Sequence, residues 1–272
     1  MITWEEFKLL FSGSLITNAL IVGILLSITA ALLGVSLVLK KYSMIGDGLS
    51  HVSFGAMAIA LATGMAPLAF ALPVVILAAF LLLRVSEKSR VKGDAAVAVV
   101  STASLAVGAI AARGMNVDIE GFMFGSIVAI TKSDVILTVI VTLFTLAIYV
   151  LFYHRIFALT FDETYTKASG GKPAFYNAMI AVMTAVTVVV GMRLVGSLLI
   201  SALIIFPALA SMRLFKSFRA VVISSAVISA VSFILSLIVS ILLDISTSAC
   251  IVLIDLLIFG CASLVATLRK TA

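Results

Sequence analysis

The chain of 272 residues is 63% hydrophobic and only 11% charged, with a mean hydropathy of +1.33. This composition excludes a soluble globular domain, which would need far more polar surface. The net charge of +6 does not indicate a nucleic-acid-binding protein, because the basic residues stand at the ends of long apolar runs.

The apolar runs predict an all-α, polytopic integral membrane protein, with residues 1–272 forming a single transmembrane domain. Many runs reach the roughly 20 residues that a helix needs to cross a bilayer. They lack the alternating pattern that is typical of an outer-membrane barrel. We count about nine spans, within a range of eight to ten. The predicted spans are 14–39, 43–64, 66–84, 95–112, 135–153, 174–191, 194–212, 220–243 and 249–268.

The placement of lysine and arginine predicts the orientation of these spans. If the spans alternate and the C-terminus is cytoplasmic, 14 of the 18 basic residues lie on the cytoplasmic side. The opposite orientation would invert this bias, so we expect a multi-pass plasma-membrane protein with its N-terminus outside. The four basic residues then left outside are Lys8, Arg113, Lys132 and Arg193.

The sequence also predicts two helix caps and one short helix in a long connection. Asp94 and Asp134 each precede an apolar run and are expected to cap the N-terminus of the helix that follows. The connection 113–134 has an apolar middle, which predicts a short helix that dips into the membrane or packs on the bundle.

A second short helix is predicted over residues 160–171, in the connection between the fifth and sixth spans. Thr160 and Glu163 fit a capping box, with Thr160 as N-cap and Glu163 at N3. Asp162 suits the positive end of the helix dipole, and Gly170 supplies the stop. This segment is either an ordinary loop helix or the element by which a transporter touches a cytoplasmic motor.

Three ionisable residues lie inside predicted spans, where an ionised side chain costs about 3 kcal/mol. Asp47 and His51 are four residues apart and therefore share one helix face. They either hydrogen-bond to each other or form a site for a cation, because carboxylate and imidazole together suit Zn²⁺ or Mn²⁺. Asp255 stands alone and is expected to be structural, either hydrogen-bonded to a neighbouring span or protonated.

Two protein ligands are too few for a closed zinc site, which uses four. A homodimer whose pathway lies on the two-fold axis would bring together two copies each of Asp47 and His51. Three glycines of the same span, Gly46, Gly48 and Gly55, are expected to let it approach a neighbouring helix closely or bend near the ionisable pair.

Five stretches, in order along nearly the whole chain, resemble the ABC-3 family, the permease subunits of bacterial zinc, manganese and iron ABC importers. They are LIVGILLSITAALLGVSLVLKKYSMIGDGLSH with Asp47 and His51, VKGDAAVAVV with Asp94, FMFGSIVAITKSD, FDETYTKASGG with Asp162, Ala168 and Gly170, and VGSLLISALIIFPALASMRLF with Gly196, Pro207, Ala210 and Arg213.

The resemblance implies a permease that imports zinc, manganese or iron into the cytoplasm, in a fold similar to the type II ABC importers. It implies a homodimer in the bacterial plasma membrane, surrounded by lipid, with two cytoplasmic ATP-binding subunits and an extracellular metal-binding protein. Asp47 and His51 match positions that handle the metal, and the segment from Thr160 to Gly171 matches the helix that couples to the ATPase. No cofactor is implied besides the transported metal.

Two other functions remain to be weighed. A secondary transporter or channel could use Asp47 and His51 for proton coupling, but such folds often contain paired repeats, and we find no convincing repeat. A membrane-embedded metal hydrolase would need more ligands than His51 and His154, and the sequence contains no HExxH motif. It also contains no Walker A motif, so an ATPase activity of this kind would belong to a partner.

Overall fold

The structure is a computed structural model that describes residues 14–88, 93–113, 125 and 130–271. Within these ranges every regular element is a helix. The helices are α2 (Ser14–Leu39), α3 (Ile45–Ala62), α4 (Pro67–Lys88), α5 (Gly93–Ala111), α7 (Lys132–Leu151), α8 (Tyr153–Phe161), α9 (Glu163–Ala168), α10 (Pro173–Val195), α11 (Ser197–Leu214), α12 (Phe218–Leu243) and α13 (Thr247–Thr271).

The long helices correspond one to one with the nine predicted spans, so the all-α membrane fold is confirmed. Seven of them are long and apolar enough to cross a bilayer, and the described parts of α4 and α5 contribute shorter apolar stretches, Pro67–Leu83 and Ala95–Ala111. The short helix predicted within 113–134 falls mostly on residues outside the described ranges.

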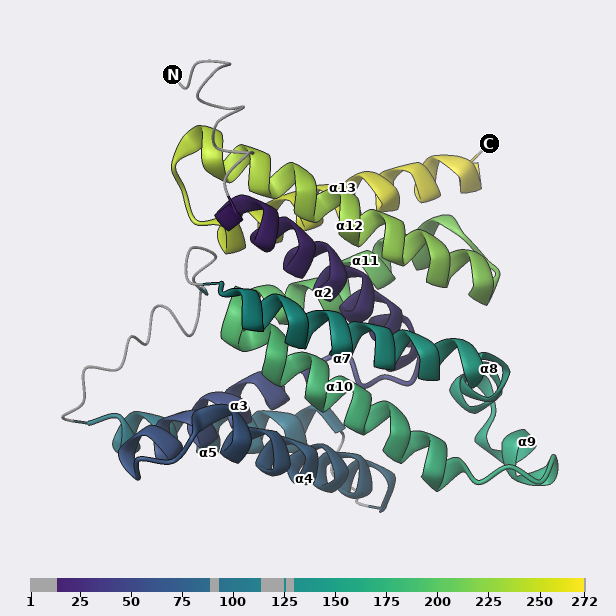
Figure 1. The fold of residues 1–272 in the computed structure, drawn as a ribbon. Coiled ribbons are helices and arrows are strands. Elements are labelled where there is room, and N and C mark those ends of the chain that lie inside the picture. Colours follow the sequence, from purple (N-terminus) through teal and green to yellow (C-terminus); the bar gives the residue numbers. More distant parts are fainter. Residues whose placement is uncertain (1–13, 89–92, 114–124, 126–129, 272) are drawn as a thin grey trace.

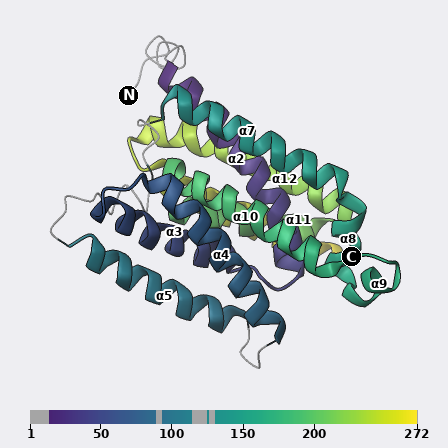
Figure 2. The ribbon, with the colours of Figure 1, turned by 60° about the horizontal axis from the view of Figure 1, so that its bottom comes forward.

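The long helices run roughly side by side, with α8 and α9 projecting at the end of the bundle where α2 ends and α10 begins (Figure 1). Helix α2 lies in the middle and packs against α7, α10, α11 and α12. Helices α3, α4 and α5 pack on one another, and α5 forms an outer edge (Figure 2). Helix α3, which carries Asp47 and His51, also packs on α10 and α11 and so joins this group to the central helices.

Glycines set the closest helix contacts around α3, as the sequence predicts. A Cβ on Gly48 would lie 2.6 Å from the Val97 side chain of α5, and a Cβ on Gly55 would lie 2.7 Å from the Ser104 carbonyl oxygen. Such close backbone approach is typical of helix pairs in membranes. The third glycine, Gly46, faces Ile204 of α11, so α3 is held from two sides.

A single residue, Gly196, separates α10 from α11. Its φ of +89° and ψ of 162° belong to a backbone region that only glycine adopts without strain. Gly125, also with a positive φ, lies against this junction: a Cβ there would come within 2.3 Å of the Val195 carbonyl carbon. The two helices thus join without a loop.

Two capping predictions need correction. Asp134 is not the N-cap of α7: Thr131 is, and Asp134 at N3 completes a capping box by accepting from the Thr131 N–H at 3.0 Å. The other Asp134 oxygen lies 3.3 Å from Arg193 Nη2 at the end of α10. Asp94 lies inside the first turn of α5, which begins at Gly93, and not before it.

Candidate metal-handling site and partner-facing helix

Asp47 and His51 lie on one face of α3, as their spacing predicts. The distance from His51 Nε2 to Asp47 Oδ2 is 3.4 Å, which is longer than a normal hydrogen bond. The Asp47 side chain is 38% exposed and the His51 side chain 22% exposed in the single chain. The pair is therefore in contact but not sealed inside the helix bundle.

Helix α3 starts inside the bundle. Gly34 of α2 and Gly46 of α3 both lie against Ile204 of α11, so the first turn of α3 is level with Gly34. Gly34 is five residues before the end of α2 at Leu39, which corresponds to about 7.5 Å along the helix. Asp47 is therefore set back from the end of α2, and it belongs to a first helical turn, where the helix dipole favours its negative charge.

The spacing of the pair suits two ligands of one metal ion. Ligands at about 2.1 Å from a tetrahedral zinc lie about 3.4 Å from each other, which equals the observed separation of Nε2 and Oδ2. Among the described residues, no group of three or more histidine, cysteine, aspartate or glutamate side chains could hold a metal. One copy of the chain thus offers two of the ligands that such an ion needs.

Ser201 of α11 is a neighbour of this pair that the sequence analysis missed. Its hydroxyl lies 3.3 Å from Asp47 Oδ1 and 3.1 Å from the Ser197 carbonyl oxygen. Asp47 therefore has Ser201 beside one oxygen and His51 beside the other. No local signal relates Ser201 to Asp47, because the two are 154 residues apart and meet only through the packing of α11 on α3.

The connection between α7 and α10 contains two helices instead of the single one predicted. Thr160 is not an N-cap: it lies in the last turn of α8 and donates to the Ile156 carbonyl oxygen at 2.7 Å. The N-cap of α9 is Asp162, whose Oδ1 accepts the Tyr165 N–H at 2.9 Å. The predicted register failed because the apolar pattern of α8 continues through Thr160, which leaves Asp162 as the first extended residue.

Helix α9 is short and projects from the bundle. Glu163 is its first residue and Ala168 its last. The predicted stop is confirmed, since Gly170 has a φ of +76° and donates its N–H to the Lys167 carbonyl oxygen at 3.0 Å. Every α9 side chain except that of Thr166 is exposed, which suits a helix that contacts another protein.

Helix α8 is anchored to the start of α12 by aromatic rings. The Phe218 ring centroid lies 5.2 Å from that of Phe157 and 5.6 Å from that of Tyr153. Burial raises the pKa of the Tyr153 phenol, an effect that the charge of Arg219 opposes. These contacts fix the position of α8, the helix that directly precedes α9.

The remaining predicted residues lie apart from the Asp47–His51 pair. Pro207 is buried within α11, and Arg213 is exposed in the last turn of that helix, where its charge suits the helix dipole. Asp255 of α13 is 1% exposed. Of the two states expected for Asp255, the hydrogen bond to a neighbouring span is not formed with good geometry by any described residue, although the Ser232 hydroxyl lies close.

Comparison with known proteins agrees with the resemblance found in the sequence. The model of the ABC 3 transport family matches residues 12–266. The manganese transport system membrane protein MntC of Halalkalibacterium halodurans is 28% identical over 94% of this chain and 89% of its own length. The high-affinity zinc uptake system membrane protein ZnuB of Buchnera aphidicola is 28% identical over 83% of this chain and 86% of its own.

A solved structure supports the same assignment. PsaBC from Streptococcus pneumoniae, in complex with Fab, superposes with a TM-score of 0.84 at 26% sequence identity, covering 94% of this chain and 93% of that chain. The fold and the family match therefore agree over nearly the full length. The chain belongs to the ABC 3 transport family, as a multi-pass membrane permease subunit of an ABC transporter.

Proposed function

We propose that this chain is the membrane subunit of an ATP-driven importer that moves a divalent transition metal, zinc or manganese, into the cytoplasm. The observation that carries the proposal is the 3.4 Å separation of His51 Nε2 and Asp47 Oδ2 on a partly exposed face of α3. Relatives named for manganese and zinc transport support the choice of metals. Iron, which the sequence resemblance also implies, is the third candidate.

In this proposal the chain acts as a homodimer. Two copies of Asp47 and His51, facing each other across a two-fold axis, would supply four ligands to one ion. A site shared between subunits suits transport, because separating the subunits slightly would release the ion. The partial exposure of both side chains in the single chain supports this arrangement, since it leaves their metal-facing atoms accessible.

The end of the bundle with α8 and α9 would face the cytoplasm. Basic residues follow or end helices there, among them Lys40, Lys41, Arg213, Lys216 and Arg269, which is the distribution expected of a cytoplasmic side. Helix α9 would bind one of two ATP-binding subunits, which hydrolyse ATP. An extracellular binding protein would deliver the metal at the opposite end.

Metal uptake by the reconstituted transporter tests the site. We expect Asp47→Asn and His51→Ala each to abolish uptake of Mn²⁺ and Zn²⁺ while the complex still assembles, because each variant removes a metal ligand. Asp244→Asn is the matched control, since Asp244 is an exposed carboxylate at a helix end. Full uptake by both site variants would refute the assignment and favour a purely structural Asp–His contact.

Purification separates this proposal from the alternative of a secondary transporter or channel. The permease should copurify with an ATP-binding subunit, and metal uptake should stop when ATP is withheld. Metal uptake that continues without ATP and follows a proton gradient would establish the alternative.

A further inference from the structure

The turn between α2 and α3 precedes the helix that carries the site, and one of its residues is held in a strained conformation. Lys41 has a φ of +63°, which costs a non-glycine residue about 1 kcal/mol. The Lys41 N–H donates to the Val38 carbonyl oxygen at 3.0 Å, and the Tyr42 N–H donates to that of Leu37 at 2.8 Å. These two bonds form a Schellman motif, which ends α2 and redirects the chain toward α3.

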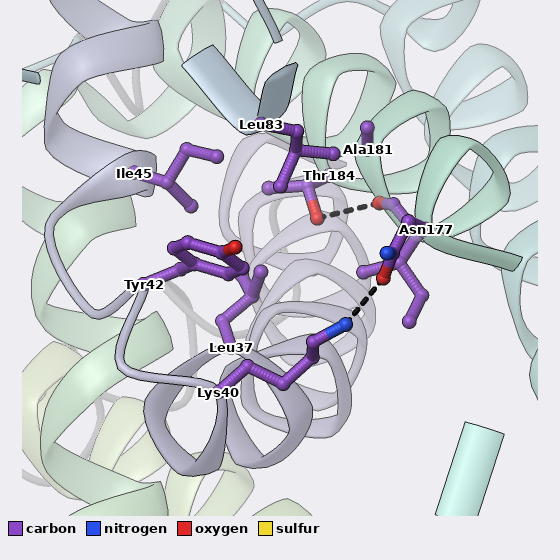
Figure 3. Close-up of a pocket in the computed structure, with 9 residues that line it drawn as sticks. Leu37, Lys40, Tyr42, Ile45, Leu83, Asn177, Ala181 and Thr184 are labelled. Atoms are coloured by element: carbon purple, nitrogen blue, oxygen red, sulfur yellow. Dashed lines mark hydrogen bonds between the residues drawn. The ribbon is translucent and has the colours of Figure 1, made fainter. Parts of the chain in front are cut away.

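The neighbouring residue, Lys40, ties this turn to α10. Its ammonium donates a hydrogen bond to the side-chain oxygen of Asn177, and the Tyr42 ring centroid lies 6.0 Å from the same nitrogen (Figure 3). Asn177 is only 6% exposed. Apolar side chains of Leu37 and Ile45 are among those that line the pocket around the contact. A charge-assisted bond in such surroundings is strong and directional, whereas apolar contacts allow sliding.

The Lys40–Asn177 contact joins the helix that follows α9 in the chain to the turn that precedes α3. Asn177 lies in the first turns of α10, which begins at Pro173 and follows α9 after the connection 169–172. On the other side, Lys40 is followed by the short turn to α3, where Asp47 lies in the first helical turn. A shift of α9 would move the start of α10. The hydrogen bond between Asn177 and Lys40 would then move the α2–α3 turn, which precedes Asp47 in the chain.

We propose that Lys40 and Asn177 are positioning residues that link α9 and α10 to the metal site through the α2–α3 turn. The inference rests on the proposed function, because it assigns to this contact the transfer of movement from the ATP-binding subunit. Helix α10 also packs directly on α3, but the Lys40–Asn177 bond joins α10 to the α2–α3 turn at one defined point.

The amount of ATP hydrolysed per metal ion imported tests the proposal. The complex of permease, ATP-binding subunit and binding protein is reconstituted in vesicles and supplied with radiolabelled Mn²⁺ and Zn²⁺. We expect Asn177→Leu and Lys40→Met to raise the ATP-to-metal ratio about tenfold, the change that the loss of a charge-assisted hydrogen bond would produce. The double variant should show no further rise, because either substitution alone removes the bond.

Two further variants separate positioning from folding. Asn177→Asp keeps an acceptor for Lys40 and should preserve the wild-type ratio. Lys41→Met is the matched control, because it removes an adjacent, exposed lysine from the same turn. A wild-type ratio in Asn177→Leu would overturn the inference, as would an equal loss of hydrolysis and uptake in Asn177→Leu and Asn177→Asp. No metal uptake by the wild-type complex would instead refute the proposed function.

Discussion

Replacing Gly34 by alanine should destabilise the bundle strongly, because no space exists for a methyl group between α2 and α11. The added Cβ would lie 1.9 Å from the Ile204 carbonyl oxygen. Restoring an ordinary contact of about 3.4 Å requires the two helices to separate by about 1.5 Å. The obstacle is backbone, which cannot rotate away, so we expect a loss near the upper end for overpacked sites, about 3 kcal/mol.

Thermal unfolding in detergent measures this effect. Cys250 is buried and Cys261 is exposed. In a Cys261→Ser background the only remaining thiol is that of Cys250, so a thiol-reactive dye reacts when unfolding exposes Cys250. A loss of about 3 kcal/mol corresponds to a fall in melting temperature of about 8 °C for a chain of this size.

The matched control is Gly260→Ala, because Gly260 is a helical glycine whose Cβ would meet nothing within 4 Å. This variant should be neutral or stabilising by about 0.5–1 kcal/mol, since alanine favours the helix. Equal melting temperatures for the Gly34 and Gly260 variants would refute the claim that α2 and α11 meet through backbone at Gly34.

Three further predictions concern caps and the site. Asp162→Ala should remove the cap of α9 and weaken binding of the ATP-binding subunit by about 1 kcal/mol, measured by titration of the purified subunits. Thr160→Ala is its control; a larger effect from Thr160 would show that Thr160, and not Asp162, caps this helix. Asp134→Ala should lower the unfolding free energy by about 1–2 kcal/mol, because it removes a capping-box acceptor and the partner of Arg193; a loss no larger than that of Arg193→Ala would mean that the cap contributes nothing. Ser201→Ala should reduce the initial rate of Mn²⁺ uptake a few-fold, since Asp47 loses a neighbour that orients it; an unchanged rate would show that α3 alone positions the carboxylate.

Local patterns were enough to predict the spans and the shared helix face of Asp47 and His51. Both features depend on periodicity and length within one helix, where the spacing of residues determines which side chains share a face. Close approach of α3 to its neighbours was one of the two roles predicted for Gly48 and Gly55, and the contacts with α5 show that role.

Features that depend on tertiary packing could not be predicted in the same way. Ser201 reaches Asp47 only because α11 packs on α3 across 154 residues of sequence. The caps were misplaced for a different reason: the segment near Thr160 and the segment near Asp134 each offer two residues able to cap. Which residue is used depends on where the preceding helix or connection ends, and that is decided by tertiary contacts.

The construction of α9 has a consequence for its local stability. A helix of six residues, Glu163–Ala168, is too short to persist alone in water. It is maintained by one side-chain cap, one glycine turn and the burial of Thr166. Local opening of such a segment requires little free energy, so its amide hydrogens should exchange with solvent faster than those of the long helices. A protein that covers α9 would therefore order it on binding, and part of the binding energy would be spent on completing the helix.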